Sequence, residues 1–178
     1  LQGGGPPDFW AHCQAVAAQM LLLAGRADDI EAAGQLANDV RQDGRALKKF
    51  RQLVRAQGGD GRVIEDDDLL PQAKLVKSVT APRDGVIAAL NARDIGWSVV
   101  RLGGGRQTKG DEIDHSVGMV IPVKVGQRLE KGDGLATIHA ADEAAWERAR
   151  DELLAAITWT EETVEPLPHI YETVRPTG

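Results

Sequence analysis

The sequence has a single cysteine, Cys13, so no disulfide can form within the chain. This fits a reducing compartment, and we expect a cytoplasmic protein. Cys13 lies on the apolar face of a predicted helix, which favours a packing role over a nucleophilic one. The longest apolar stretch, from Ala15 to Gly25, is interrupted by Gln19 and is too short to span a bilayer. No basic segment precedes a hydrophobic one at the N-terminus, so we expect neither a signal peptide nor a membrane partner.

Positive charge is also scarce, because 21 lysine and arginine residues face 27 aspartate and glutamate residues. A net charge of -6 argues against a surface that follows nucleic-acid phosphates, so no nucleic-acid partner is expected. The three serines include none in a Gly-x-Ser-x-Gly elbow, and nothing else in the sequence points to a Ser-His-Asp set.

Metal-ligand patterns are lacking as well. No two histidines have helical i, i+4 spacing, and none stands beside the cysteine. The acidic run Glu65–Asp68 lacks the glycine and the distal carboxylate of a calcium loop, which favours a solvated connector. We therefore expect no metal and no cofactor. The histidines, which we interpret as surface or packing residues, are His12, His115, His139 and His169.

The first part of the chain has helical periodicity. Apolar residues recur at i+3 and i+4, which predicts helices over about 8–24, 29–42 and 45–57. The first helix has an unusually wide apolar arc, so we expect it to be buried on more than one side. Glycines end all three helices. One face of the first helix carries Phe9, Cys13, Val16, Met20 and Leu23, and the adjoining face carries Trp10, Ala17, Leu21 and Ala24.

From residue 73 the pattern changes to short strands mixed with helices. Alternating and β-branched residues predict strands over 75–80, 85–90, 118–125, 135–139 and 158–164. Helices are predicted over 92–102 and 143–157. The sequence therefore predicts an α+β protein with two domains, a helical segment at 1–72 and a β-rich module at 73–178.

Two glycine runs need separate interpretation. Phosphate-binding loops place glycines before a helix, where free N–H groups face the anion. Gly58-Gly59 and Gly103–Gly105 both follow predicted helices, so we interpret them as helix ends. Arg106 and Lys109 would nevertheless give the loop after Gly105 an anion-facing tip, and they are the candidate functional residues of this chain.

One motif pair suggests another class of protein. Pro82-x-x-Gly85-x-Ile87 and the later Val125-Gly126 segment resemble the two halves of a biotinyl or lipoyl carrier module. The intervening segment is longer than a carrier hairpin, contains a predicted helix, and places Lys109 without the usual flanking residues. A non-catalytic carrier-like or interaction module is therefore the alternative hypothesis.

Five segments in their order along the chain resemble the C-terminal part of the pyrimidine nucleoside phosphorylases, which include thymidine phosphorylase. The resemblance implies a large α/β domain, of which 1–72 would be a helical remnant, followed by an α/β-hammerhead, barrel-sandwich-like domain. The segments are GRALKKFRQLVRAQGGD at 44–60, LLPQA at 69–73, APRDGVIAALNARDIGWSVVRLGGGR at 81–106, DEIDHSVGMVIPVKVG at 111–126 and KGDGLATIHA at 131–140.

The resemblance implies a homodimeric pentosyltransferase. It would convert thymidine or uridine and phosphate, a co-substrate, into the free base and a (deoxy)ribose 1-phosphate. The family's Lys-His-Ser-Thr-Gly-Gly and Arg…Ser-Ile-x-Ser-Lys-Lys motifs do not occur in this sequence, so we assign no catalytic residue. We expect this chain to be inactive without the missing N-terminal part of the enzyme. Its expected role is structural, and the segment 102–114 with Arg106 and Lys109 would help to close the substrate cleft.

Overall fold

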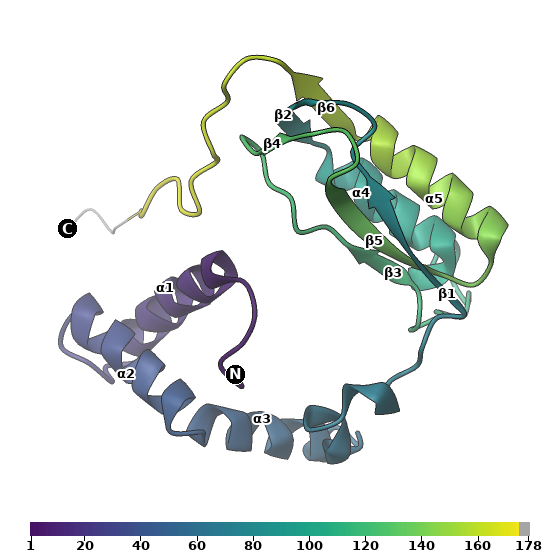
Figure 1. Ribbon diagram of the computed structural model, residues 1–178. Coiled ribbons are helices and arrows are strands. Elements are labelled where there is room, and N and C mark those ends of the chain that lie inside the picture. Colours follow the sequence, from purple (N-terminus) through teal and green to yellow (C-terminus); the bar gives the residue numbers. More distant parts are fainter. Residues whose placement is uncertain (175–178) are drawn as a thin grey trace. The chain divides into compact units, whose positions relative to one another are not determined.

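The computed structural model describes residues 1–174, and within it the chain divides into two compact units. The first unit contains Leu1–Asp67 together with the C-terminal segment from Pro168. The second unit contains Asp68–Leu167. The mixture of helices and sheets confirms the α+β class (Figure 1).

The first unit is built from α1 (Pro7–Leu23), α2 (Ile30–Gln42) and α3 (Arg45–Ala56). Pro7 occupies the first turn of α1, where its missing N–H costs no hydrogen bond. The Asp29 carboxylate caps α2 by accepting from the Ala32 N–H at 2.7 Å. The Gly59 N–H donates to the Val54 carbonyl at 2.9 Å, which confirms the predicted helix end. Two 3₁₀ turns, Gly61–Ile64 and Asp67–Leu69, lie in the segment that was expected to be an irregular connector.

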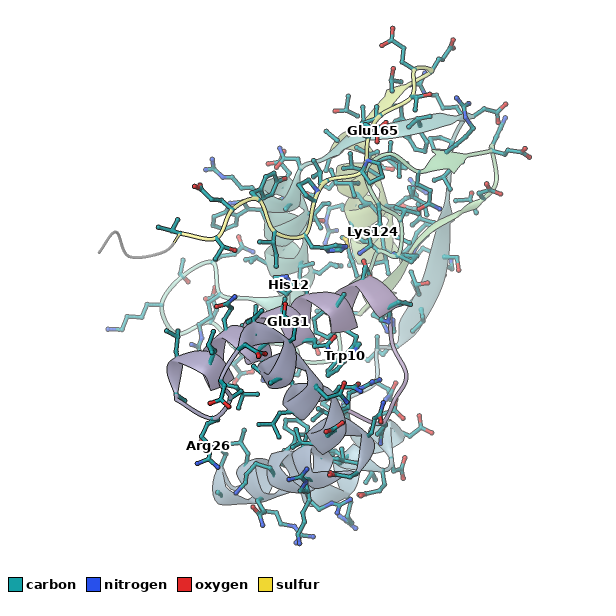
Figure 2. All side chains as sticks on the ribbon, turned by 90° about the vertical axis from the view of Figure 1, so that its left-hand side faces the viewer. Trp10, His12, Arg26, Glu31, Lys124 and Glu165 are labelled. Atoms are coloured by element: carbon teal, nitrogen blue, oxygen red, sulfur yellow. The ribbon has the colours of Figure 1, made fainter. Side chains whose placement is uncertain are left out.

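Small side chains fill the contact between α1 and α2. The buried apolar residues of this unit are the alanines Ala18, Ala33 and Ala37. The Gln14 side chain donates to the Gly34 carbonyl at 3.1 Å across the same contact. The Arg41 guanidinium lies 4.2 Å from the ring centre of Trp10, which Figure 2 labels on α1. The two helices therefore approach closely without a core of large side chains.

The prediction that α1 is buried on more than one side is wrong for this chain. Four of its apolar residues stay exposed: Phe9 at 65%, Val16 at 46%, Met20 at 66% and Leu23 at 87%. Cys13, on the same face, is only half-buried. The physical reason is that, among the described residues of this unit, α2 is the helix that packs extensively against α1, and it covers one side only.

The second unit contains two antiparallel three-stranded sheets. One sheet has the order β1-β5-β3 and the other β4-β2-β6. The strands are β1 (Leu75–Thr80), β2 (Gly85–Leu90), β3 (Gly118–Val120), β4 (Arg128–Leu129), β5 (Gly134–Ala140) and β6 (Ile157–Thr160). Leu75 pairs with Ala140 and Val79 with Ala136, so the longest ladder joins segments about 60 residues apart.

The two sheets share one hydrophobic core. Fully buried Ile87, Leu135 and Ile138 come from strands of both sheets, and Leu153 comes from α5 (Glu143–Ala155). Helix α4 (Ala92–Val99) lies beside α5, and α5 also contacts β1 and β5 (Figure 1). The Asp142 carboxylate caps α5 by accepting from the Ala145 N–H at 2.8 Å.

Several predicted bounds differ from the structure. The strand predicted over 118–125 ends at Val120, and the residues around Pro122, which has no N–H to donate, are irregular. The closing strand predicted over 158–164 spans only Ile157–Thr160, and the helix predicted over 92–102 ends at Val99. Strand β4 was not predicted, because two residues carry no periodicity.

Candidate functional site

The candidate site is the glycine loop, residues 103–114, which follows α4. The Asn91 side chain caps α4 by accepting from the Asp94 N–H at 3.3 Å. A single π-helical turn, Val100–Gly104, then replaces the expected α-helical end. Such turns break the regular hydrogen-bond ladder and are frequent at functional sites.

Each of the three glycines occupies a position where a larger residue would be unfavourable, and the cause differs from one position to the next. Gly103 has a φ of 107°, which favours glycine. A Cβ on Gly104 would lie 2.9 Å from Val99 Cγ1, and one on Gly105 would lie 2.8 Å from Val100 Cγ2. The chain therefore folds back tightly on the end of the helix, in agreement with our interpretation of these glycines as a helix end.

Asp111 organises the tip of the loop. Its carboxylate accepts hydrogen bonds from the Thr108 hydroxyl at 2.6 Å, the Thr108 N–H at 2.9 Å and the Gln107 N–H at 3.1 Å. The Thr108 hydroxyl is the largest cause of a lowered pKa for Asp111. The tip is thus a small turn closed around an ionised carboxylate.

The two predicted cations occupy different positions in this turn. The Arg106 Nε donates to the Asp111 carbonyl at 3.0 Å, so Arg106 helps to hold the turn. Lys109 is exposed at the tip and has no hydrogen-bond or ion-pair partner among the described residues 1–174. Lys109, rather than Arg106, therefore offers an unpaired positive charge.

Asp114 fixes the base of the loop. Its N–H donates to the Gly103 carbonyl at 2.9 Å, which joins the two ends. Its carboxylate accepts from the Ser116 hydroxyl at 2.6 Å and the Ser116 N–H at 2.9 Å. The Ser116 hydroxyl is the first cause of the lowered pKa of Asp114, with a smaller contribution from neighbouring His115.

Sequence reasoning found the cations of the loop and missed Asp111 and Asp114. The available signal was the spacing Thr108-x-x-Asp111 and Asp114-x-Ser116, in which short polar side chains bond to nearby backbone N–H groups. Of the histidines, exposed His115 directly follows Asp114 at the base of the loop, and half-buried His139 pairs with Val76 and Gly118 within a sheet. Within residues 1–174, no cluster of three or more His, Cys, Asp or Glu side chains is arranged to hold a metal ion.

Two three-stranded sheets around one core, with α4 and α5 packed beside them, define a small α+β domain. Residues 86–160 match the family model of the pyrimidine nucleoside phosphorylase C-terminal domain. The resemblance found in the sequence is confirmed: this chain carries the C-terminal domain of the pyrimidine nucleoside phosphorylases.

Curated relatives extend this similarity beyond the matched domain. The chain is 43% identical over 140 residues to a pyrimidine-nucleoside phosphorylase of Staphylococcus haemolyticus, covering 79% of this chain and 32% of the relative. It is 38% identical over 157 residues to that of Bacillus subtilis, covering 88% and 35%. For Geobacillus stearothermophilus, the values are 39% over 140 residues, 79% and 32%. The chain thus spans about a third of the length of these relatives.

The carrier-module alternative is not supported. The relatives are phosphorylases, and the residues between β2 and β3 form α4, the π turn and the glycine loop, so Lys109 does not lie on a hairpin between two strands. Among the described helices, none has both the length and the apolar character required to cross a membrane.

Proposed function

We propose that this chain is the C-terminal portion of a cytoplasmic phosphorylase that converts thymidine or uridine and phosphate into the free base and a (deoxy)ribose 1-phosphate. The similarity to named pyrimidine-nucleoside phosphorylases over 79–88% of the chain carries this proposal. The chain alone is inactive, because the family's phosphate and base motifs are absent from its sequence. The enzyme needs no cofactor, and phosphate is its co-substrate.

In the proposed enzyme, residues 1–72 belong to the large α/β domain and residues 73–178 form the hammerhead-type, barrel-sandwich-like domain. The pairing of two three-stranded sheets around one core supports the second assignment over Leu75–Thr160, whereas the segment from Pro168 groups with the first unit. The weak core of the helical unit supports the first, because a unit whose buried apolar residues are alanines gains little stability from its own packing.

The partner of the helical unit is the N-terminal part of the same enzyme. Phe9, Met20 and Leu23 are at least 65% exposed on one face of α1, and apolar side chains of this size normally lie inside a protein. The relatives are about two and a half times as long as this chain and supply the chain length to cover that face. The complete enzyme is a homodimer in this proposal.

The glycine loop would close over the substrate cleft and exclude water. Its prefolded turn supports this role, because Arg106 and Asp111 hold the tip and leave Lys109 free to meet an anionic group. This assigns different roles to the two cations: Arg106 shapes the loop, and Lys109 interacts with the ligand.

A chimaeric enzyme tests the proposed activity. The corresponding C-terminal portion of the Bacillus subtilis relative is replaced by this chain, and thymidine and uridine phosphorolysis are measured. We expect turnover by the chimaera and none by this chain alone or by the truncated relative alone. Turnover by this chain alone would contradict the proposed inactivity, and a folded but inactive chimaera would contradict the assignment to the phosphorylase.

The same chimaera tests the loop. Lys109→Ala should raise the KM for phosphate or nucleoside, whereas Arg106→Ala should lower kcat because it loosens the turn. Arg93→Ala, which removes an exposed cation from α4, is the matched control. If Lys109→Ala and Arg106→Ala leave both constants at the control values, the loop has no part in closure.

A further inference from the structure

A small polar cavity lies between α4 and α5, next to the point where the glycine loop leaves the helix. It belongs entirely to the second unit. Its volume is about 10 Å³. The residues that line it are Ser98, Arg101, Leu102, Ala145, Arg148, Ala149 and Glu152.

Ser98 is the unusual member of this group. It is the one buried polar residue among the described residues 1–174, with 0% of its surface exposed. Its Oγ has no hydrogen-bond partner within the protein. Buried hydroxyl groups in folded proteins are nearly always bonded, since an unpaired one has lost its hydration without compensation.

An ionised carboxylate lies at the same cavity. The Arg101 Nε donates to Glu152 Oε1 at 2.7 Å, and this contact is the first cause of a lowered pKa for Glu152. The Ser98 hydroxyl also lowers that pKa, so it lies near the carboxylate, although the two do not meet the geometry of a direct hydrogen bond. The cavity therefore brings a hydroxyl and a carboxylate close together without a hydrogen bond of ordinary geometry between them.

We propose that this cavity is a binding site for one ordered water molecule, which accepts from or donates to Ser98 Oγ and bonds to the Glu152 carboxylate. A water molecule needs a volume of about 10–15 Å³ and two to four polar partners. The cavity meets the lower limit of this volume, and Ser98, Arg101, Arg148 and Glu152 supply polar groups. The small volume also excludes a nucleoside or a phosphate ion as the occupant.

The site has a structural consequence for the glycine loop. Arg101 and Leu102 line the cavity and belong to the π turn, whereas Glu152 belongs to α5. A water molecule bonded to both Ser98 and Glu152 would tie the end of α4 to α5. The root of the loop would then be fixed from below while its tip stays exposed.

A crystal structure of this chain at high resolution tests the site directly. We expect a spherical density peak about 2.7–3.2 Å from Ser98 Oγ, within hydrogen-bond distance of Glu152. If the density shows no water there, the proposal is wrong, whether the Ser98 hydroxyl then bonds to a main-chain carbonyl of α4 or directly to the Glu152 carboxylate.

The sign of a stability change gives an independent test. Ser98→Ala removes a bonded hydroxyl if the water is present, so the Tm should fall, and amide exchange at residues 100–104 should become several-fold faster. If the hydroxyl is unpaired, the same change removes an unfavourable group, and the Tm should stay constant or rise. Ser78→Ala, at an exposed position on β1, is the matched control and should change neither quantity.

Discussion

Gly126 packs against the segment that follows β6, and its replacement by alanine should destabilise the second unit more than other glycine changes. Gly126 has a φ of 87°, and a Cβ there would lie 2.6 Å from the Val164 carbonyl oxygen and 3.2 Å from the Pro166 nitrogen. Both neighbours are backbone atoms, so the segment must move as a whole. The Gly126 N–H also donates to the Ile87 carbonyl at 2.8 Å, which limits movement on the other side.

Gly126→Ala should therefore carry two costs. The left-handed backbone costs a non-glycine residue about 1–2 kcal/mol, and the steric overlap adds about 1–3 kcal/mol. Gly110→Ala is the matched control for the cost of the left-handed backbone. Gly110 has a φ of 105°, and a Cβ there would have no other atom within 4 Å. Gly118→Ala has neither feature and sets the baseline.

The assay is urea unfolding of the 178-residue chain, followed by tryptophan fluorescence, for the wild type and all three variants. We expect the midpoint to fall in the order Gly118→Ala, Gly110→Ala, Gly126→Ala, with an unchanged m-value. Equal midpoints for Gly110→Ala and Gly126→Ala would refute the claim that the segment 164–166 packs on this turn.

Three further predictions concern the core, a helix cap and pH. Leu153→Ala, at a position with 0% exposure, should lower the free energy of unfolding by about 2–5 kcal/mol in the urea assay. Asp142→Ala should cost about 1 kcal/mol because α5 loses its cap, whereas Asp142→Asn should cost little; equal losses would contradict a capping role. Arg62 lowers the pKa of Asp60 from 3.8 to about 2, so the stabilising contribution of Asp60 is present above pH 4 and lost as pH falls toward 2. The urea midpoints of wild type and Asp60→Asn should therefore converge over that range, and a constant difference would contradict the lowered pKa.

For some strands, local sequence signals predicted the first and last residues correctly. Strands 75–80 and 85–90 have the predicted bounds, because alternating residues flank a turn at Pro82–Asp84. The pairing of β1 with β5 was not predictable in this way, since its partners lie about 60 residues apart and no local pattern specifies register at that distance.

The end of α4 shows why other features could not be read from the sequence. Helical periodicity continues to Leu102, yet the α-helix ends at Val99 and becomes a π turn. Arg101 there bonds to Glu152, which is 51 residues away on α5, so a tertiary contact accompanies the change. Likewise, Arg106 and Lys109 are candidates from the sequence because of their charge alone, whereas the shape of the loop depends on the acceptor Asp111.

The opposite kind of disagreement occurs at α1. Its apolar arc predicted burial on two sides, and the structure of this chain covers only the side that faces α2. The periodicity was interpreted correctly, because Phe9, Val16 and Met20 do share a face, and all three are exposed among the described residues. A sequence records the packing of the whole protein in which it evolved, and this chain spans about a third of its relatives. In the proposed enzyme, the N-terminal part of the protein would cover this exposed face of α1.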